Sequence, residues 1–228
     1  MQSDRIFRVG TRRSPLALKQ VEEVLHLLKE FYPYFNANVI TIDTYADKDK
    51  ITPISDIEGT DFFTREIDNA LLQGEIDFAV HSAKDLPDEN RERLVVTAIT
   101  KPLDPWEALV SKNNLKLNEL PYGAKVGASS SRRKTQLKNF RSDLKIANIR
   151  GNIQERLRKL EETDLDAIVV AVCALMRLGL EDRISERISL EILRPHPFQG
   201  SLAVVARESD KDLNKFLSKI DSREAVTI

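Results

Sequence analysis

The chain has 228 residues, enough for two domains of roughly 100 residues each. It carries 35 Lys and Arg against 36 Asp and Glu, and this balance argues against a nucleic-acid binder held by a bulk positive field. No apolar run approaches the roughly 20 residues of a membrane span, the first residues show no secretory signal, and one cysteine excludes an internal disulfide. We therefore expect a cytoplasmic protein without nucleic-acid, membrane or metal partners.

Short apolar runs alternate with amphipathic stretches along the chain, a pattern typical of parallel sheets connected by helices. Ser14 and Pro15 predict the start of a helix that ends before Pro33, because serine caps a helix and proline suits its first turn. The other predicted helices cover residues 62–72, 131–140, 153–162, 174–178 and 210–220. The predicted strands cover residues 6–9, 39–45, 77–81, 94–100, 108–111, 125–128, 145–149, 165–172 and 202–206.

Two proline-rich segments predict a division of the chain. Pro102 and Pro105 lie close together, as do Pro195 and Pro197, and a compact α/β series lies between the two pairs. The last strand and helix are too short to stand alone, so we expect them to return to the first half. The sequence thus predicts an α/β fold of two lobes with a cleft between them. Lobe 1 comprises residues 1–101 plus 199–228, lobe 2 comprises residues 105–195, and the interlobe crossings are residues 102–104 and 196–198.

Arginines recur where predicted strands pass into helices. The carboxyl edge of an open α/β sheet is where ligands bind, helix N-termini there attract anions, and guanidinium groups add bidentate contacts to carboxylates or phosphates. Recurrence at four junctions predicts a ligand with many negative groups, although any single arginine would more often be a surface charge. We assign Arg158, Arg183 and Arg187 to that surface class. The junction arginines are Arg12, Arg13, Arg132, Arg133, Arg150, Arg156 and Arg177.

A second candidate site follows the predicted strand at residues 77–81, which runs into Lys84 and Asp85 and is stopped by Pro87. A carboxylate among cations stays ionised and can stabilise a developing cation or direct protons at a reacting centre. Spacing alone leaves open a turn carboxylate that caps local N–H groups. We expect His81 to be a satisfied core residue rather than a base.

Six segments of the chain resemble the porphobilinogen deaminase family, also called hydroxymethylbilane synthases. They occur in the family's order from one end of the chain to the other, and HSAKDLP together with SSSRR and RGNIQERL is highly specific. The segments are RVGTRRSPLAL (8–18), FFTREIDNALLQGEIDFAVHSAKDLP (62–87), VGASSSRRKTQL (126–137), IRGNIQERLRKL (149–160), LDAIVVAVCALMRLGLE (165–181) and PFQGSLAVVAR (197–207).

The resemblance implies a transferase of tetrapyrrole and heme biosynthesis. Such an enzyme condenses four porphobilinogen units head to tail into a linear tetrapyrrole, hydroxymethylbilane, and releases ammonia at each step. Each unit carries an acetate and a propionate, so the growing chain is the kind of polyanion that the arginines predict. The family motif makes Asp85 the catalytic carboxylate, which would hold the pyrrole nitrogens and stabilise the cationic methylene-pyrrolenine. The side chains that match binding residues are Arg12, Ser14, Lys84, Ser129, Ser130, Arg132, Arg133, Arg150, Arg156, Arg177 and, at the second crossing, Gln199.

The family fold implied is two lobes resembling periplasmic binding proteins, with a small third domain that we expect to be absent here. In the family that domain supplies the cysteine that holds a dipyrromethane primer by a thioether, and Cys173 matches no such cysteine. Three alternatives stay open. The arginines alone could hold the primer, or Cys173 could attach it, although a lone cysteine is more often an inert core residue. In the third alternative the protein has lost turnover and only binds its ligand. We expect a monomer that binds porphobilinogen and the growing polypyrrole chain. The alternative is a non-catalytic two-lobed binding protein for tetrapyrrole precursors or other polycarboxylates.

Overall fold

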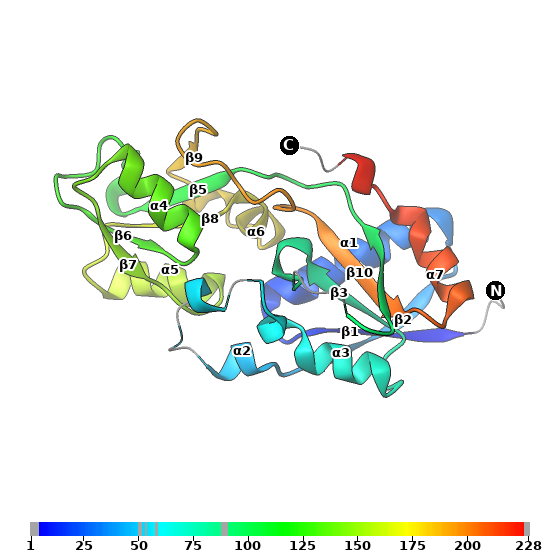
Figure 1. Ribbon diagram of the computed structural model, residues 1–228. Helices are drawn as coiled ribbons and strands as arrows, with labels where there is room; N and C mark the ends of the chain where they lie inside the picture. The colour runs from blue at the N-terminus through cyan, green and yellow to red at the C-terminus, as the bar shows by residue number, and fades with distance from the viewer. Residues whose placement is uncertain (1–4, 50–51, 53, 58, 88–90, 226–228) are drawn as a thin grey trace. The chain divides into compact units, whose positions relative to one another are not determined.

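The computed structural model describes residues 5–49, 52, 54–57, 59–87 and 91–225. The chain forms two α/β units, each built around a five-stranded sheet (Figure 1). The first unit comprises Met1–Lys48, Gly59–Leu103 and Gly200–Ile228, and the second comprises Asp49–Glu58 and Asp104–Gln199. The stretch Asp49–Glu58 therefore belongs with the second unit, whereas its position in the sequence places it within the first predicted lobe.

The sheet of the first unit has the strand order β2-β1-β3-β10-β4. β1 is parallel to β2 and β3, whereas β10 is antiparallel to β3 and β4. The last strand thus joins the first sheet, as the sequence predicts, but the expectation of parallel sheets is wrong for β10. The alternation of strands and helices does not reveal whether a strand is parallel or antiparallel to its neighbour when many residues separate the two in the sequence. The strands are β1 (Ile6–Arg12), β2 (Asn36–Ile42), β3 (Phe78–Ser82), β4 (Leu94–Ile99) and β10 (Leu202–Arg207).

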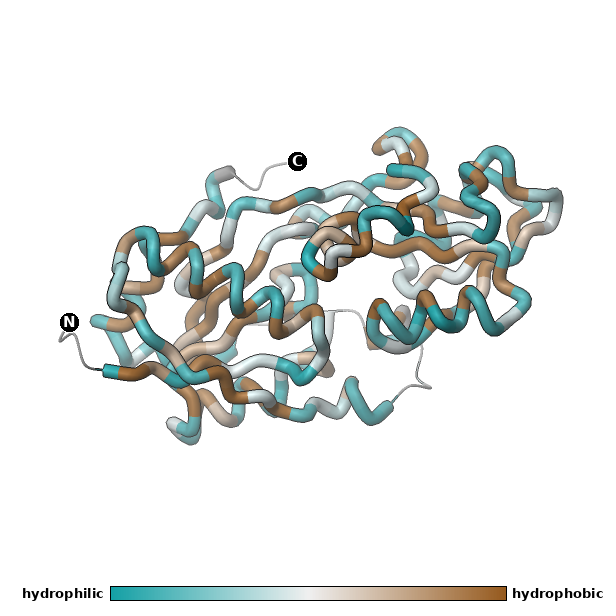
Figure 2. The backbone as a smooth tube through the Cα atoms, turned by 180° about the vertical axis from the view of Figure 1, so that it is seen from behind, coloured by the Kyte–Doolittle hydropathy of each residue, from teal (hydrophilic) through white to brown (hydrophobic). Residues whose placement is uncertain are grey.

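Helices cover both faces of this sheet. α1 (Pro15–Phe31) and α7 (Lys211–Leu217) pack with Phe78 and Val80 on one face, and α3 (Arg65–Leu72) packs with Ala79 on the other. Because successive strand residues point to opposite faces, a strand covered on both sides is an uninterrupted apolar run. Figure 2 shows this concentration of apolar residues along the central strands of each unit.

The second unit repeats the plan with the strand order β7-β6-β8-β5-β9. β6 is parallel to β7 and β8, and β5 is antiparallel to β8 and β9. The helices α4 (Ser131–Phe140), α5 (Ile153–Glu162) and α6 (Val172–Arg177) each follow one of the parallel strands. The strands are β5 (Glu107–Ser111), β6 (Lys125–Ala128), β7 (Lys145–Asn148), β8 (Ala167–Ala171) and β9 (Glu186–Ile188).

Several elements differ from their predicted bounds. The helix expected over residues 62–72 is a 3₁₀ turn, Asp61–Phe63, followed by α3, because Thr64, with φ −121° and ψ −22°, departs from helical geometry. β2 begins three residues before the predicted strand, and most of its residues are exposed, so no apolar pattern marks it. The short elements β9 and α2 (Tyr45–Lys48) have no sequence signal of their own. In the described part of the chain, every helix is too short or too polar to cross a membrane.

Candidate active site

The carboxyl edge of the first sheet brings together the predicted site residues that follow β1 and β3. These two strands are parallel neighbours, with Val9 opposite Phe78 and Gly10 opposite Ala79. Gly10 leaves room for the side chain of Ile76, since a Cβ there would lie 2.2 Å from its Cδ1. The residues that share this edge are Arg12, Ser14, Lys84 and Asp85.

Asp85 ends a 3₁₀ turn, Ala83–Asp85, that is fixed from both sides. The Oγ of Ser82 accepts a hydrogen bond from Nε2 of Gln20 on α1 (2.9 Å), and the N–H of Ala83 donates to the carbonyl of Ser201 (3.0 Å). Asp85 is half-buried, and its carboxylate has no hydrogen-bond or ion-pair partner among the described residues. The alternative of a carboxylate that caps local N–H groups therefore finds no support there, and the group can accept protons or cations from a ligand.

Arg12 at the same edge is held by an internal carboxylate. Its guanidinium forms an ion pair with Asp47 of α2 and lies 5.3 Å from the ring centre of Phe63. Burial raises the pKa of Asp47, but the hydrogen bonds and charge of Arg12, together with Thr44, lower it more, so the pKa lies below its ordinary value. Ser14 caps α1, since its Oγ accepts from the N–H of Ala17 (3.3 Å). Both side chains are thus positioned before any ligand binds.

His81 lies within β3, four residues before Asp85, and is buried. Desolvation, with added repulsion from Arg91 and Arg12, lowers its pKa to about 3, so the imidazole is neutral near pH 7. Its Nε2 has no hydrogen-bond partner in the described part of the chain. The expectation of a core position is confirmed, but the expectation that its polar atoms are satisfied is not.

The carboxyl edge of the second sheet gathers the remaining junction residues. β6 pairs in parallel with β7 on one side and with β8 on the other, so the three strands end at one edge. The Oγ of Ser129 donates to the carbonyl of Ile149 (2.8 Å) and ties the end of β6 to the end of β7. The residues that follow these three strands are Ser129, Ser130, Arg132, Arg133, Arg150, Arg156, Cys173 and Arg177.

The helices that begin at this edge present N-termini suited to anions. Ser130 caps α4 by accepting from the N–H of Arg133 (3.3 Å), and the first turn of α4 contains no acidic residue. Asn152 caps α5 in a reciprocal capping box with Glu155. Glu155 is the acidic residue in the first turn of α5, and its carboxylate is engaged in this capping box. Gly151 has a φ of 109°, and a Cβ there would lie 2.7 Å from a carboxylate oxygen of Glu155. Positive helix ends thus face this edge.

The arginines of this edge are oriented by backbone carbonyls. Arg132 donates through Nη1 to the carbonyl of Arg194 (2.9 Å), and Arg156 donates through Nε to the carbonyl of Gly151 (2.9 Å). Arg150 is largely buried and donates through Nη2 to the carbonyl of Asp49 (2.7 Å). These bonds fix the positions of the three guanidinium groups at this edge.

Arg133 lies in the interior, where its contacts are structural. It forms a bidentate pair with Glu107, with Nε and Nη2 at 2.8 and 2.5 Å from the two carboxylate oxygens, and Nη1 lies 3.4 Å from the carbonyl of Val169. Glu107 is fully buried and also pairs with Arg132 at 3.4 Å. Sequence reasoning missed Glu107, although an acid at the start of an apolar strand signals a buried partner. The predicted contact of Arg133 with a ligand stays a prediction.

Cys173 and Gln199 are both covered by protein. Cys173 follows β8 in the first turn of α6 and is 4% exposed. Gln199 donates through Nε2 to the carbonyls of Pro105 (2.8 Å) and Trp106 (3.3 Å), and all three residues belong to the second unit. No three His, Cys, Asp or Glu side chains of the described residues form a metal-binding group.

Comparison with known proteins identifies the family. Residues 7–215 match the model of "Porphobilinogen deaminase, dipyromethane cofactor binding domain". The chain is 47% identical over 219 residues to the porphobilinogen deaminase of Natranaerobius thermophilus and 45% identical over 217 residues to that of Pelotomaculum thermopropionicum. These alignments cover 96% and 95% of this chain and 70% of each relative.

Solved structures of low sequence identity share the fold. The periplasmic VFT2 domain of BvgS from Bordetella pertussis aligns with a TM-score of 0.53 at 15% identity, covering 97% of this chain and 90% of that domain. The probable amino-acid ABC transporter extracellular-binding protein ytmK from Bacillus subtilis aligns with a TM-score of 0.52 at 15% identity, covering 95% and 90%. The predicted α/β class with two lobes resembling periplasmic binding proteins is confirmed. By its motifs, its family model and its relatives, this chain belongs to the porphobilinogen deaminase family.

Proposed function

We propose that this protein is a hydroxymethylbilane synthase, a transferase of tetrapyrrole biosynthesis that condenses four porphobilinogen units head to tail and releases ammonia at each step. The observation that carries the proposal is the carboxylate of Asp85, held on a fixed turn and left without a partner among the described residues. A protein that only bound polycarboxylates would gain nothing from an open carboxylate, because it repels an anionic ligand.

Asp85 acts on the reacting ring. When the C–N bond of porphobilinogen breaks, the amine leaves as ammonia and the ring becomes a cationic methylene-pyrrolenine. A carboxylate near that cation stabilises it, and it accepts hydrogen bonds from pyrrole N–H groups. The next ring then forms the carbon–carbon bond and loses a proton. The buried His81 stays neutral, so it adds no charge that would oppose the cation.

The arginines of the second unit bind acidic side chains of the pyrrole chain. Arg132, Arg150 and Arg156 follow neighbouring parallel strands, and backbone carbonyls hold each of them, so little side-chain freedom is lost on binding. These guanidiniums fit the carboxylates of dipyrromethane, the cofactor named by the family model. That cofactor supplies the primer to which pyrrole rings are added. Ser129, Ser130, Arg177 and, in the first unit, Arg12, Ser14 and Lys84 complete the proposed binding set.

The test is the reaction of the purified protein with porphobilinogen, with ammonia and the linear tetrapyrrole both measured. We expect stoichiometric ammonia and tetrapyrrole from the unmodified sequence, and a rate about 10²- to 10⁴-fold lower for Asp85→Asn. The matched control, Asp182→Asn, changes an exposed carboxylate of the second unit and should leave the rate unchanged. Unchanged turnover of Asp85→Asn would end the assignment of Asp85, and binding without ammonia would favour the non-catalytic alternative.

We also propose that the protein binds no nucleic acid, because its 35 basic and 36 acidic residues leave almost no net charge to recruit a polyanion non-specifically. It works as a monomer in the cytoplasm. Light scattering of the purified protein and fractionation of cells test these two points.

A further inference from the structure

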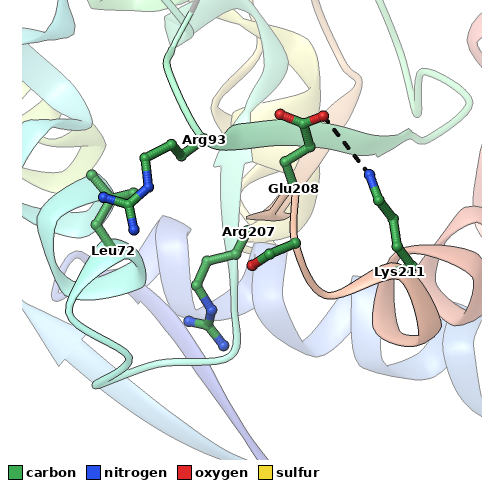
Figure 3. A pocket seen from close by; sticks show the side chains of 6 residues that line it. Leu72, Arg93, Arg207, Glu208 and Lys211 are labelled. Carbon is green, nitrogen blue, oxygen red and sulfur yellow. Dashed lines mark ion pairs between the residues drawn. The ribbon is translucent and has the colours of Figure 1, made fainter.

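A pocket of about 250 Å³ lies at the amino edge of the first sheet, opposite the edge that carries Asp85. β10 runs antiparallel to β3, with Ala206 opposite Phe78, so Arg207 lies where β3 begins. Figure 3 shows Lys211 turned toward Glu208, Arg93 beside Leu72, and the side chain of Arg207 extending away from Lys211. The lining residues are Leu72, Arg93, Arg207, Glu208, Ser209 and Lys211.

The wall of this pocket has a surplus of guanidinium groups. Arg207 donates through Nη1 to the carbonyls of Leu71 (2.7 Å) and Ile76 (2.8 Å), and its Nη2 lies 3.9 Å from Asp77. Asp77 is shared, since it also pairs with Arg8 at 3.1 Å and Arg5 at 3.3 Å. One carboxylate thus faces three guanidiniums, and the positive charge behind the pocket is only partly compensated.

Arg93 supplies an unengaged guanidinium. Its side chain makes no hydrogen bond or ion pair within the part of the chain that the structure describes. Its φ of 64° is left-handed, which is uncommon for a residue other than glycine. The carbonyl of Arg93 accepts from the N–H of Glu208 (2.8 Å), so the turn is fixed to the end of β10. A residue kept in such a conformation at a pocket suggests a role for its side chain.

Lys211 is held only loosely. Its Nζ lies 3.7 Å from a carboxylate oxygen of Glu208, and the two side chains are 75% and 64% exposed. An exposed pair of this kind contributes at most about 1 kcal/mol, so an incoming anion can replace Glu208 as the partner of Lys211. Leu72 adds an apolar wall.

We propose that this pocket binds a small oxyanion ligand, a phosphate or a pair of carboxylates on a compact body, through Arg93, Arg207 and Lys211. A volume of about 250 Å³ lies below the range usual for drug-sized ligands, so a polypyrrole chain is too large for it. The site is separate from the carboxyl edge and does not depend on the proposed reaction. Phosphate esters and small dicarboxylates share the chemistry that the three cations recognise.

Calorimetric titration of the whole protein with inorganic phosphate and with succinate, at constant ionic strength, tests the proposal. We expect saturable binding of at least one probe, and the tighter probe identifies the acidic group. Arg93→Gly removes the guanidinium without backbone strain and should weaken binding about tenfold, the loss of one charge-assisted contact. Glu208→Gln removes the competing carboxylate and should tighten binding about threefold.

The two variants should change the affinity for the probe in opposite directions, which separates an effect on ligand binding from a loss of structure. Arg158→Ala, which changes an exposed arginine on α5 of the other unit, is the control and should leave both affinities unchanged. The proposal is overturned if neither probe gives saturable heat, or if Arg93→Gly and Arg158→Ala weaken binding equally.

Discussion

The two units share one strand plan and differ in the charges at the carboxyl edge of the sheet. In each sheet the second strand, β1 or β6, lies between two parallel neighbours, and an antiparallel strand and an edge strand lie beyond them. In the first unit Arg12 is paired with Asp47, and the open group is a carboxylate, Asp85. In the second unit the acid, Glu107, is buried and pairs with Arg132 and Arg133. The same scaffold thus presents an anion in one unit and cations in the other.

The largest expected effect of a single change concerns the buried acid of the second unit. Glu107→Gln leaves the buried Arg133 without its charged partner, and removing one member of a buried pair costs about 3–5 kcal/mol. Denaturant unfolding measures the loss. The matched control is Glu162→Gln, which breaks an exposed pair with Arg158 and should cost less than about 1 kcal/mol. If Glu107→Gln lowered the free energy of unfolding by less than about 1 kcal/mol, the pair of Glu107 and Arg133 would not stabilise the second unit as proposed.

A smaller effect is expected for the paired acid of the first unit, and it depends on pH. Since the pKa of Asp47 is lowered in the folded state, its contribution is present above the unfolded value of about 3.8 and is lost as pH falls through the folded pKa. Asp47→Asn should cost about 1–2 kcal/mol at pH 7 and much less at pH 3. Urea unfolding at both pH values checks this. An equal cost of Asp47→Asn at both pH values would contradict the pairing with Arg12.

The smallest effect is expected at the buried thiol of the second unit. Since Cys173 is covered by protein, we expect Cys173→Ala to turn over porphobilinogen at an unchanged rate and to retain any pyrrole mass that the native protein carries. Intact mass spectrometry of both proteins, compared with the masses calculated from sequence, measures this directly. A pyrrole adduct that disappears with the substitution would place the attachment at Cys173 after all.

Local signals in the sequence predict the edges of the sheets but not their pairings. Ser14 before Pro15, and Asn152 three residues before Glu155, are capping patterns that mark the helix starts beside the arginines. The pairs Arg12 with Asp47 and Arg133 with Glu107 join residues 35 and 26 positions apart, and no periodicity reveals them. The direction of β5 and β10 likewise depends on tertiary contacts. For this reason the positions of the arginines were predictable, but the burial of Arg133 was not.

The separate roles of Asp85 and Arg156 are tested most directly by the steady-state kinetics of two variants on porphobilinogen. Asp85→Asn should lower kcat by about 10²- to 10⁴-fold at saturating substrate. Arg156→Ala should leave kcat within a few-fold and raise KM by about ten- to a hundredfold, the loss of a charged hydrogen bond. If Asp85→Asn raised only KM, or Arg156→Ala lowered only kcat, the assignment of the chemistry to Asp85 and of substrate binding to Arg156 would be contradicted.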